Sequence, residues 1–169
     1  MTVRYLIGPP GVGKSTALAS VTSGWSLTLQ LKPFAHQVSA EGIVLGRGDR
    51  DFPGTDTLSM SVLPKAVDWL ERQPDSVLIV GEGDRLATVK FFEAATVAGH
   101  DVRVAALVAP KAVVAARAKA RGSEQAAAWV SGRWTKTQRL IAALPVRVVD
   151  ATRPADTVAA EISDWIRER

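Results

Sequence analysis

The stretch that most constrains this fold lies near the start of the chain and reads Gly8-Pro9-Pro10-Gly11-Val12-Gly13-Lys14-Ser15. A short β-prone run from Val3 to Ile7 precedes it, and the residues that follow it favour a helix. A strand, a loop with the spacing G-x-x-x-x-G-K-S and a helix make up a Walker A loop. The stretch therefore predicts a site for a nucleoside triphosphate.

Each residue type in this loop has a physical reason to be there. Glycines let the backbone wrap closely around a polyphosphate, with N–H groups and a helix N-terminus directed at it. Lys14 is expected to reach the β- and γ-phosphates, and the Ser15 hydroxyl to ligate Mg²⁺. The residues expected to bind the nucleotide here are Gly8, Pro9, Pro10, Gly11, Val12, Gly13, Lys14, Ser15 and Thr16.

Hydrophobic patterning extends the motif to a whole fold. The mostly apolar runs at 76–80 and 102–108 are typical of buried parallel strands, and helical patterns separate the strand candidates. We expect an α/β protein with the three-layer P-loop NTPase fold: a parallel sheet of about five strands, helices on both faces, and an Arg-rich helical lid. At 169 residues, the chain is long enough for one such domain, spanning 1–169.

Several local patterns give more specific expectations. Residues 25–31 alternate and predict a second strand, whereas 34–42 predict a loop or a short helix. Asp56 is placed to cap a helix that Pro64 would kink or split. Ser131-Gly132 is expected to end one short helix, and Thr135, with Gln138 three residues later, to open the next.

A second acidic element follows the strand at 76–80. The residues Gly81-Glu82-Gly83-Asp84-Arg85 have the layout of a Walker B strand end, where an acid joins the P-loop hydroxyl in holding magnesium. Glu82 is the first acid beyond the strand and is our candidate for the metal or its water shell. Asp84 is a second candidate, or it caps the next helix.

The loop at 46–56 offers carboxylates for proton transfer. A kinase needs a carboxylate to accept or orient the proton of the attacking hydroxyl. Loops at the carboxyl ends of strands gather around the ligand in such sheets. Asp56 is the first candidate for this base, with helix capping as its other interpretation, and Asp49 is the second.

A basic segment runs from Lys111 to Arg139 and contains seven cations against one acid, Glu124, within a chain whose net charge is +4. We interpret 117–136 as a lid. Arginines that close over a transferring phosphate stabilise its spreading charge. Arg121 and Arg133 are the catalytic candidates, and Arg117 is expected to bind the nucleotide. Trp129 and Trp134 either stack on a base or belong to the core.

Missing residue types exclude several classes. The chain has no cysteine, so it has no disulfide framework and no zinc–thiolate site. It has no asparagine, which argues against a GTPase because the guanine-reading motif Asn-Lys-x-Asp needs one. No apolar run approaches the ~20 residues of a membrane span, and a cytoplasmic location fits this composition.

The order of these elements resembles the small P-loop kinases of the nucleotide-kinase type. Gly54-Thr55-Asp56, Gly81-Glu82-Gly83-Asp84-Arg85-Leu86 and Gly132-Arg133-Trp134-Thr135-Lys136 look like a group of small bacteriophage kinases. Some of these phosphorylate the hydroxymethyl group of 5-hydroxymethyluracil in DNA. The resemblance implies ATP and Mg²⁺ at the P-loop, a base among the loop carboxylates, a DNA-facing lid and, for a phage protein, the host cytoplasm.

Two other functions remain open at this stage. A kinase of a free nucleoside monophosphate, or of another small hydroxyl compound, would carry the same lid arginines. The Gly-Pro-Pro-Gly loop is also similar to that of AAA+ ATPases. Against that alternative, the strand end at Glu82 lacks an Asp-Glu pair, and little chain is left for an extra helical domain.

Overall fold

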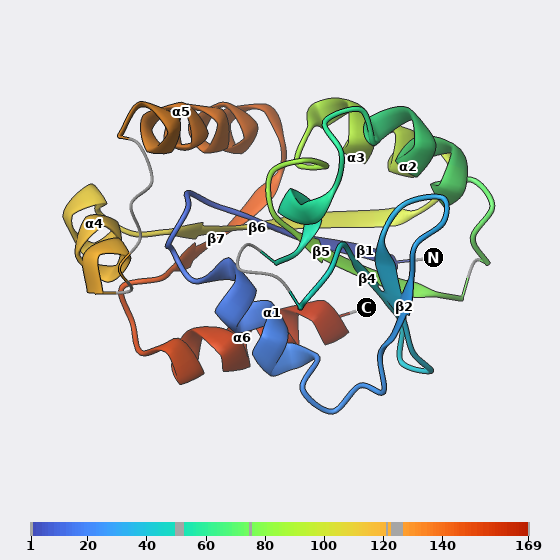
Figure 1. Ribbon diagram of the computed structural model, residues 1–169, viewed down its shortest axis with the longest axis horizontal. Helices are drawn as coiled ribbons and strands as arrows, with labels where there is room; N and C mark the ends of the chain where they lie inside the picture. Colours follow the sequence, from blue (N-terminus) through green and yellow to red (C-terminus); the bar gives the residue numbers. More distant parts are fainter. Residues whose placement is uncertain (1, 50–52, 75, 121, 123–126, 169) are drawn as a thin grey trace.

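The computed structural model describes residues 2–49, 53–74, 76–120, 122 and 127–168. Strands and helices alternate over most of the chain (Figure 1). The strands are β1 Thr2–Ile7, β2 Thr28–Gln30, β3 His36–Val38, β4 Ile43–Leu45, β5 Leu78–Glu82, β6 Asp101–Val108 and β7 Val146–Asp150. The helices are α1 Lys14–Val21, α2 Leu63–Leu70, α3 Val89–Val97, α4 Lys111–Ala120, α5 Ala127–Ala143 and α6 Ala155–Arg167, with a 3₁₀ turn, η1, at Thr55–Thr57.

The strands form one seven-stranded sheet in the order β2-β3-β4-β5-β1-β6-β7. β4, β5, β1, β6 and β7 are parallel to their neighbours in this group, which confirms the expected α/β class and parallel core. Two antiparallel strands, β2 and β3, extend the edge beyond β4. The expectation of a loop or short helix at 34–42 was therefore wrong, because His36–Val38 pairs along β4. The second strand is also shorter than predicted.

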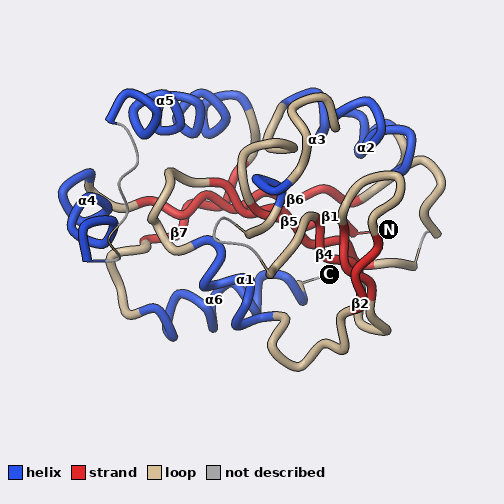
Figure 2. The backbone as a smooth tube through the Cα atoms, viewed as in Figure 1, coloured by secondary structure: helices blue, strands red, loops and turns tan. Residues whose placement is uncertain are grey.

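Helices cover both faces of the sheet. α1 and α6 lie on one face, and α2, α3 and α5 lie on the other (Figures 1 and 2). Side chains of β1 alternate accordingly, with Tyr5 and Ile7 in the cluster under α2 and α3, and Leu6 in the cluster under α1 and α6. Burial on both faces explains why the central strands are mostly apolar.

The lid segment differs from expectation in its helices. One helix, α5, runs through Ser131 and Gly132 without a break, and Thr135 donates its hydroxyl to the Ser131 carbonyl inside that helix. The prediction of two helices separated here was wrong. A mid-helix glycine costs about 1 kcal/mol relative to alanine, and burial of Thr137 and Leu140 on the same helix offsets that cost.

The predicted helix start at Asp56 was also wrong. η1 covers Thr55–Thr57 only, and the next helix, α2, begins at Leu63 with Pro64 in its first turn, where proline is tolerated. The Asp56 carboxylate instead accepts a hydrogen bond from the Asp84 backbone N–H. Among the described residues, no helix is long and apolar enough to cross a membrane.

Candidate active site

The P-loop connects β1 to α1 at the carboxyl edge of the parallel sheet. Gly8 has a φ of 152°, and a Cβ at this position would lie 2.7 Å from the Leu107 carbonyl oxygen of β6. Gly13, with a φ of 111°, is the N-cap of α1. Only glycine fits the close approach at Gly8, and a helix that begins directly after this loop directs its free N–H groups into it.

The first residue of α1, Lys14, folds back over the loop. Its ammonium group donates to the carbonyl oxygens of Gly8 and Pro9, at 3.0 and 3.3 Å. It also lies close enough to Glu82 to favour the charged form of that carboxylate. The lysine thus stands between the glycine-rich loop and the acid at the end of β5.

Ser15 and Glu82 meet directly beside it. The Ser15 hydroxyl donates to Glu82 Oε1 at 2.9 Å, and Glu82 is only 2% exposed. Burial raises the pKa of Glu82 above its usual range, although Lys14 and the Ser15 hydroxyl oppose the shift. The positive charge near Glu82 is therefore too small to offset the cost of burying its ionised carboxylate.

This pair fits the magnesium ion that P-loop sites use. A hydroxyl and a carboxylate oxygen are the hard donors that Mg²⁺ prefers, and Mg²⁺ takes few protein ligands because phosphates and water supply the others. Among the described residues, no group of three or more His, Cys, Asp and Glu side chains offers a dedicated metal cage. The donor set suits an ion that arrives with a nucleotide.

A cluster of charged side chains links η1, the loop after β5 and α5. Arg133 forms an ion pair with Asp84 and lies 3.9 Å from Asp56 Oδ1. Lys136 donates to the Asp84 carbonyl oxygen at 2.7 Å and lies 3.0 Å from its carboxylate. Burial and the neighbouring Arg133 and Arg85 lower the pKa of Lys136 to about 8. The structure thus brings the candidates Asp56 and Arg133 together.

Other candidates lie elsewhere. Asp49 is exposed and forms a bidentate ion pair with Arg47, at 2.6 and 2.8 Å. Arg121 falls outside the described residues. Trp134 is half-buried, packs against the α1–α6 cluster and lies under the Lys111 ammonium, so it belongs largely to the core.

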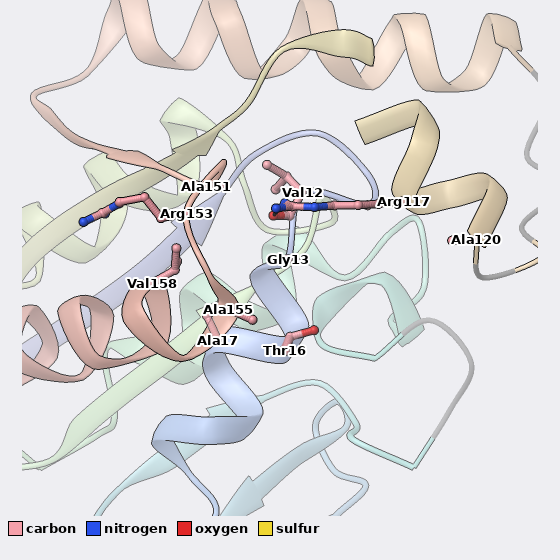
Figure 3. Close-up of a pocket in the computed structure, with 11 residues that line it drawn as sticks. Val12, Gly13, Thr16, Ala17, Arg117, Ala120, Ala151, Arg153, Ala155 and Val158 are labelled. Carbon is pink, nitrogen blue, oxygen red and sulfur yellow. Dashed lines mark hydrogen bonds between the residues drawn. The ribbon is translucent and has the colours of Figure 1, made fainter. Parts of the chain in front are cut away.

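A cavity of about 320 Å³ lies beside the P-loop, between α4 and the start of α6 (Figure 3). Gly11, Gly13 and Thr16 line it from the loop side, and Arg117 lines it from α4. The Arg117 guanidinium donates to the Val12 carbonyl oxygen at 3.4 Å. Four of the predicted nucleotide-binding residues on the loop, Gly11, Val12, Gly13 and Thr16, therefore share one cavity with Arg117.

Sequence reasoning missed the opposite wall of this cavity. Ala151, Arg153 and Ala155 line it from the loop between β7 and α6. Arg153 donates to the Asp150 carbonyl oxygen and forms an ion pair with Glu161, and these contacts fix its side chain along the wall of the cavity. Its guanidinium extends away from Arg117 (Figure 3). The signal was present, because residues 151–155 follow a parallel strand, where ligands gather.

Comparison with solved structures supports the architecture. A gluconokinase from Sinorhizobium meliloti 1021 superposes with a TM-score of 0.54 at 14% sequence identity, covering 98% of this chain and 91% of the other. A sugar kinase from Janibacter sp. gives a TM-score of 0.52 at 15% identity, with 98% and 94% covered. At these identities the likeness shows a shared fold. A search of curated proteins finds no significant match.

The family assignment comes from the sequence model described as P-loop Nucleotide Kinase3, which matches residues 1–157. That match covers nearly the whole chain, including the P-loop, the Glu82 strand end, the α5 cations and most of the cavity beside Arg117. It also decides against the AAA+ alternative. The chain belongs to the P-loop nucleotide kinase family and is a phosphotransferase.

Proposed function

We propose that this protein transfers the γ-phosphate of ATP to a hydroxyl group of a nucleotide or nucleic acid. The observation that carries the proposal is the contact between the Ser15 hydroxyl and the buried Glu82 carboxylate, with Lys14 close by. An ionised carboxylate such as that of Glu82 is costly to bury without a cation beside it. A magnesium–triphosphate complex supplies that cation and brings the phosphate to be transferred.

The nucleotide would lie across the P-loop and the adjacent cavity. Gly8 to Thr16 would hold the phosphates through backbone N–H groups, Lys14 and the Ser15 hydroxyl, as the motif leads us to expect. The cavity of about 320 Å³ lined by Thr16, Arg117 and Arg153 is of a size suited to the nucleoside. Its apolar walls and the planar Arg117 guanidinium favour a flat aromatic base.

The acceptor would enter on the side of Asp56. We assign Asp56 the role of accepting or orienting the proton of the attacking hydroxyl, and Arg133 the role of stabilising charge on the transferring phosphate. Arg133 lies 3.9 Å from Asp56, so one short movement of α5 would bring both groups to the same substrate. Asp49 stays the second candidate for the base, and Arg121 a further candidate cation.

The first acceptor to test is the hydroxymethyl group of 5-hydroxymethyluracil in DNA. The resemblance of the segments around Asp56, Glu82 and Arg133 to phage kinases supports this choice. Exposed cations on α4 and α5 also suit a polyanion, namely Lys111, Lys119 and Arg139.

A small hydroxyl compound, such as a free nucleoside monophosphate, is the second candidate. The observation that favours it is the inward pairing of Arg133 and Lys136 with Asp84. These two cations face the loop after β5 and not the outer surface, so they suit a ligand that fits between α5 and that loop. A long duplex would contact the exposed cations instead.

Labelled ATP with a panel of acceptors separates these possibilities. The panel holds plain DNA, DNA containing 5-hydroxymethyluracil, free nucleotides and simple sugars, each with and without Mg²⁺. Transfer to modified DNA only, with affinity falling steeply as salt rises, is the expected result. Transfer to free nucleotides but not to polymer would overturn the DNA acceptor. ATP hydrolysis without transfer to any acceptor would overturn the proposed function.

A further inference from the structure

A buried hydroxyl joins the two loops that carry the candidate base and the candidate metal ligand. Tyr5, on β1, donates to the Gly83 carbonyl oxygen at 3.1 Å, and its oxygen lies 2.7 Å from the Thr55 hydroxyl. Thr55 is completely buried and directly precedes Asp56, whereas Gly83 directly follows Glu82. One phenol thus ties both loops to the central strand.

The two loops are packed too closely to shift independently. A Cβ on Gly83 would lie 2.8 Å from the Thr55 hydroxyl and 3.1 Å from the Asp56 backbone nitrogen. A Cβ on Gly54 would collide with the Glu82 carboxylate. The Asp84 N–H also links the two loops, because it donates to Asp56 Oδ1 at 2.9 Å. The position of the Asp56 carboxylate therefore depends on where the Glu82 loop is held.

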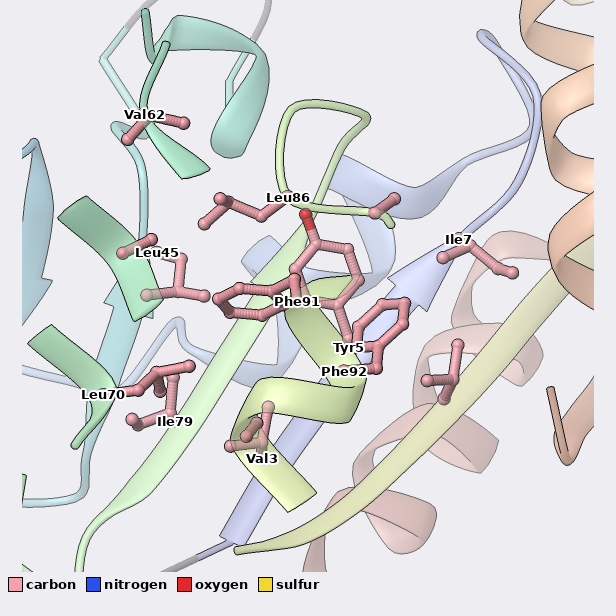
Figure 4. Close-up of a cluster of buried hydrophobic side chains, with 14 of the residues drawn as sticks. Val3, Tyr5, Ile7, Leu45, Val62, Leu70, Ile79, Leu86, Phe91 and Phe92 are labelled. Carbon is pink, nitrogen blue, oxygen red and sulfur yellow. The ribbon is translucent and has the colours of Figure 1, made fainter. Parts of the chain in front are cut away.

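The Tyr5 ring is itself fixed by its surroundings. Phe91 and Phe92 of α3 meet it edge to face, with ring centroids 6.1 and 5.3 Å away (Figure 4). Its hydroxyl points away from these rings and towards the loop that contains Leu86 (Figure 4). Burial raises the pKa of the Tyr5 hydroxyl well above its usual range, so the group keeps its proton and remains a donor.

We infer that Tyr5 is a positioning residue for phosphoryl transfer: its hydroxyl sets the distance between Asp56 and the Ser15–Glu82 pair. This inference rests on the proposed function, in which Asp56 acts on the attacking hydroxyl. Tyr5 touches neither nucleotide nor acceptor and acts through Thr55 and Gly83. Catalytic geometry is sensitive to such supports, because a displacement of about 1 Å can cost about a hundredfold in rate.

The test replaces only the hydroxyl. Tyr5→Phe keeps the ring between Phe91 and Phe92 but leaves the Thr55 hydroxyl and the Gly83 carbonyl without this partner. We expect kcat to fall about tenfold or more, with the KM for ATP unchanged, because the P-loop is not altered. In the ligand-free protein, we expect hydrogen exchange of the Asp84 amide, followed by NMR, to accelerate about tenfold.

Two further comparisons separate positioning from general stability. Leu70→Ala, on α2, disturbs the same core cluster without altering the rings that hold Tyr5, and it should leave kcat and Asp84 exchange near wild type even if the melting temperature falls. Thr55→Val, which removes the partner hydroxyl, should reproduce the loss in kcat, and Thr55→Ser, which keeps it, should restore most of the rate.

Each outcome bears on the inference. An active wild-type enzyme with unchanged kcat in Tyr5→Phe would overturn it, as would an equal loss in Leu70→Ala. If wild type phosphorylates no acceptor, the proposed function fails, and Asp84 exchange alone then decides whether Tyr5 positions Asp56. Unchanged exchange in Tyr5→Phe overturns that part as well.

Discussion

Replacing Glu82 by glutamine separates two effects of its charge: the cost of burying it in the folded protein and its proposed role in binding magnesium. The amide has nearly the same shape, and its oxygen still accepts the Ser15 hydroxyl bond. It carries no charge, so the desolvation that raises the pKa of Glu82 no longer acts. We expect Glu82→Gln to be at least as stable as wild type without ligands and to lose the stabilisation by magnesium.

The size of the effect follows from burial. Each unit by which the folded-state pKa exceeds the unfolded one disfavours ionised Glu82 by about 1.4 kcal/mol. The folded protein binds this proton more tightly, so the cost is absent below the unfolded-state pKa and complete above the folded-state value. For a chain of this length, about 1 kcal/mol corresponds to about 2–4 °C in melting temperature.

Ligand binding gives the opposite signature. A ligand at about 100 times its Kd stabilises the folded state by about 2.7 kcal/mol, or about 5–11 °C on the same scale. For wild type, a non-hydrolysable ATP analogue should raise the melting temperature further when Mg²⁺ is added. In Glu82→Gln that magnesium-dependent increment should disappear, because the carboxylate that we propose as a ligand is gone.

Thermal unfolding at pH 7.5, followed by circular dichroism, measures both quantities with the analogue and with either Mg²⁺ or EDTA. Glu93→Gln is the matched control, because it makes the same change on the exposed side of α3 and should behave as wild type. The reasoning fails if ligand-free Glu82→Gln melts several degrees lower, or if it keeps the full increment from Mg²⁺.

Three further predictions concern the groups around Glu82. Asp56→Asn should abolish phosphoryl transfer but leave the Kd of the ATP analogue, measured by calorimetry, nearly unchanged. Asp49→Asn should retain most of the transfer rate. The reverse result would make Asp49 the base. Lys14→Ala should lower kcat and weaken triphosphate binding together, and a normal Kd for the analogue would contradict its placement on the phosphates. Burial and neighbouring cations lower the pKa of Lys136 to about 8, so its charge is present below that pH and lost above it. If a small anionic acceptor binds Lys136 between α5 and the loop after β5, the wild-type KM for that acceptor should rise between pH 7 and 9 while that of Lys136→Arg stays flat, and parallel pH profiles for both proteins would refute binding by Lys136.

The parallel core of the fold could be predicted from sequence because each of its strands left a local signal. Val77 to Val80 and Val104 to Val108 are apolar throughout, as burial on both faces requires. β3 left no such signal. His36 in that strand is buried against Trp69 of α2, a contact between segments far apart in sequence. The unbroken α5 was missed for the same reason, since tertiary contacts override the local preference of Gly132.

The candidate site divides in a similar way. The P-loop and the strand end at Glu82 could be recognised in the sequence because each motif consists of consecutive residues. The contacts of the Tyr5 hydroxyl with Thr55 and Gly83 could not be predicted from sequence. A tyrosine in a mostly apolar strand has the same pattern as a core residue until the fold brings these two residues to its hydroxyl. Arg153 could be placed only once the sheet order was known, since the pairing of β6 with β7 brings it to the cavity beside the P-loop.

The bridge between Arg47 and Gly54 has a consequence for how this kinase can change. Their backbones exchange hydrogen bonds at 2.8 and 3.4 Å, and this pairing closes the base of the loop between them, directly before Thr55. A loop closed at its base can gain or lose residues at small entropic cost. Insertions between these two residues would therefore leave Asp56 in register with Glu82, and new acceptor preferences could evolve there, or be engineered, without rebuilding the catalytic centre.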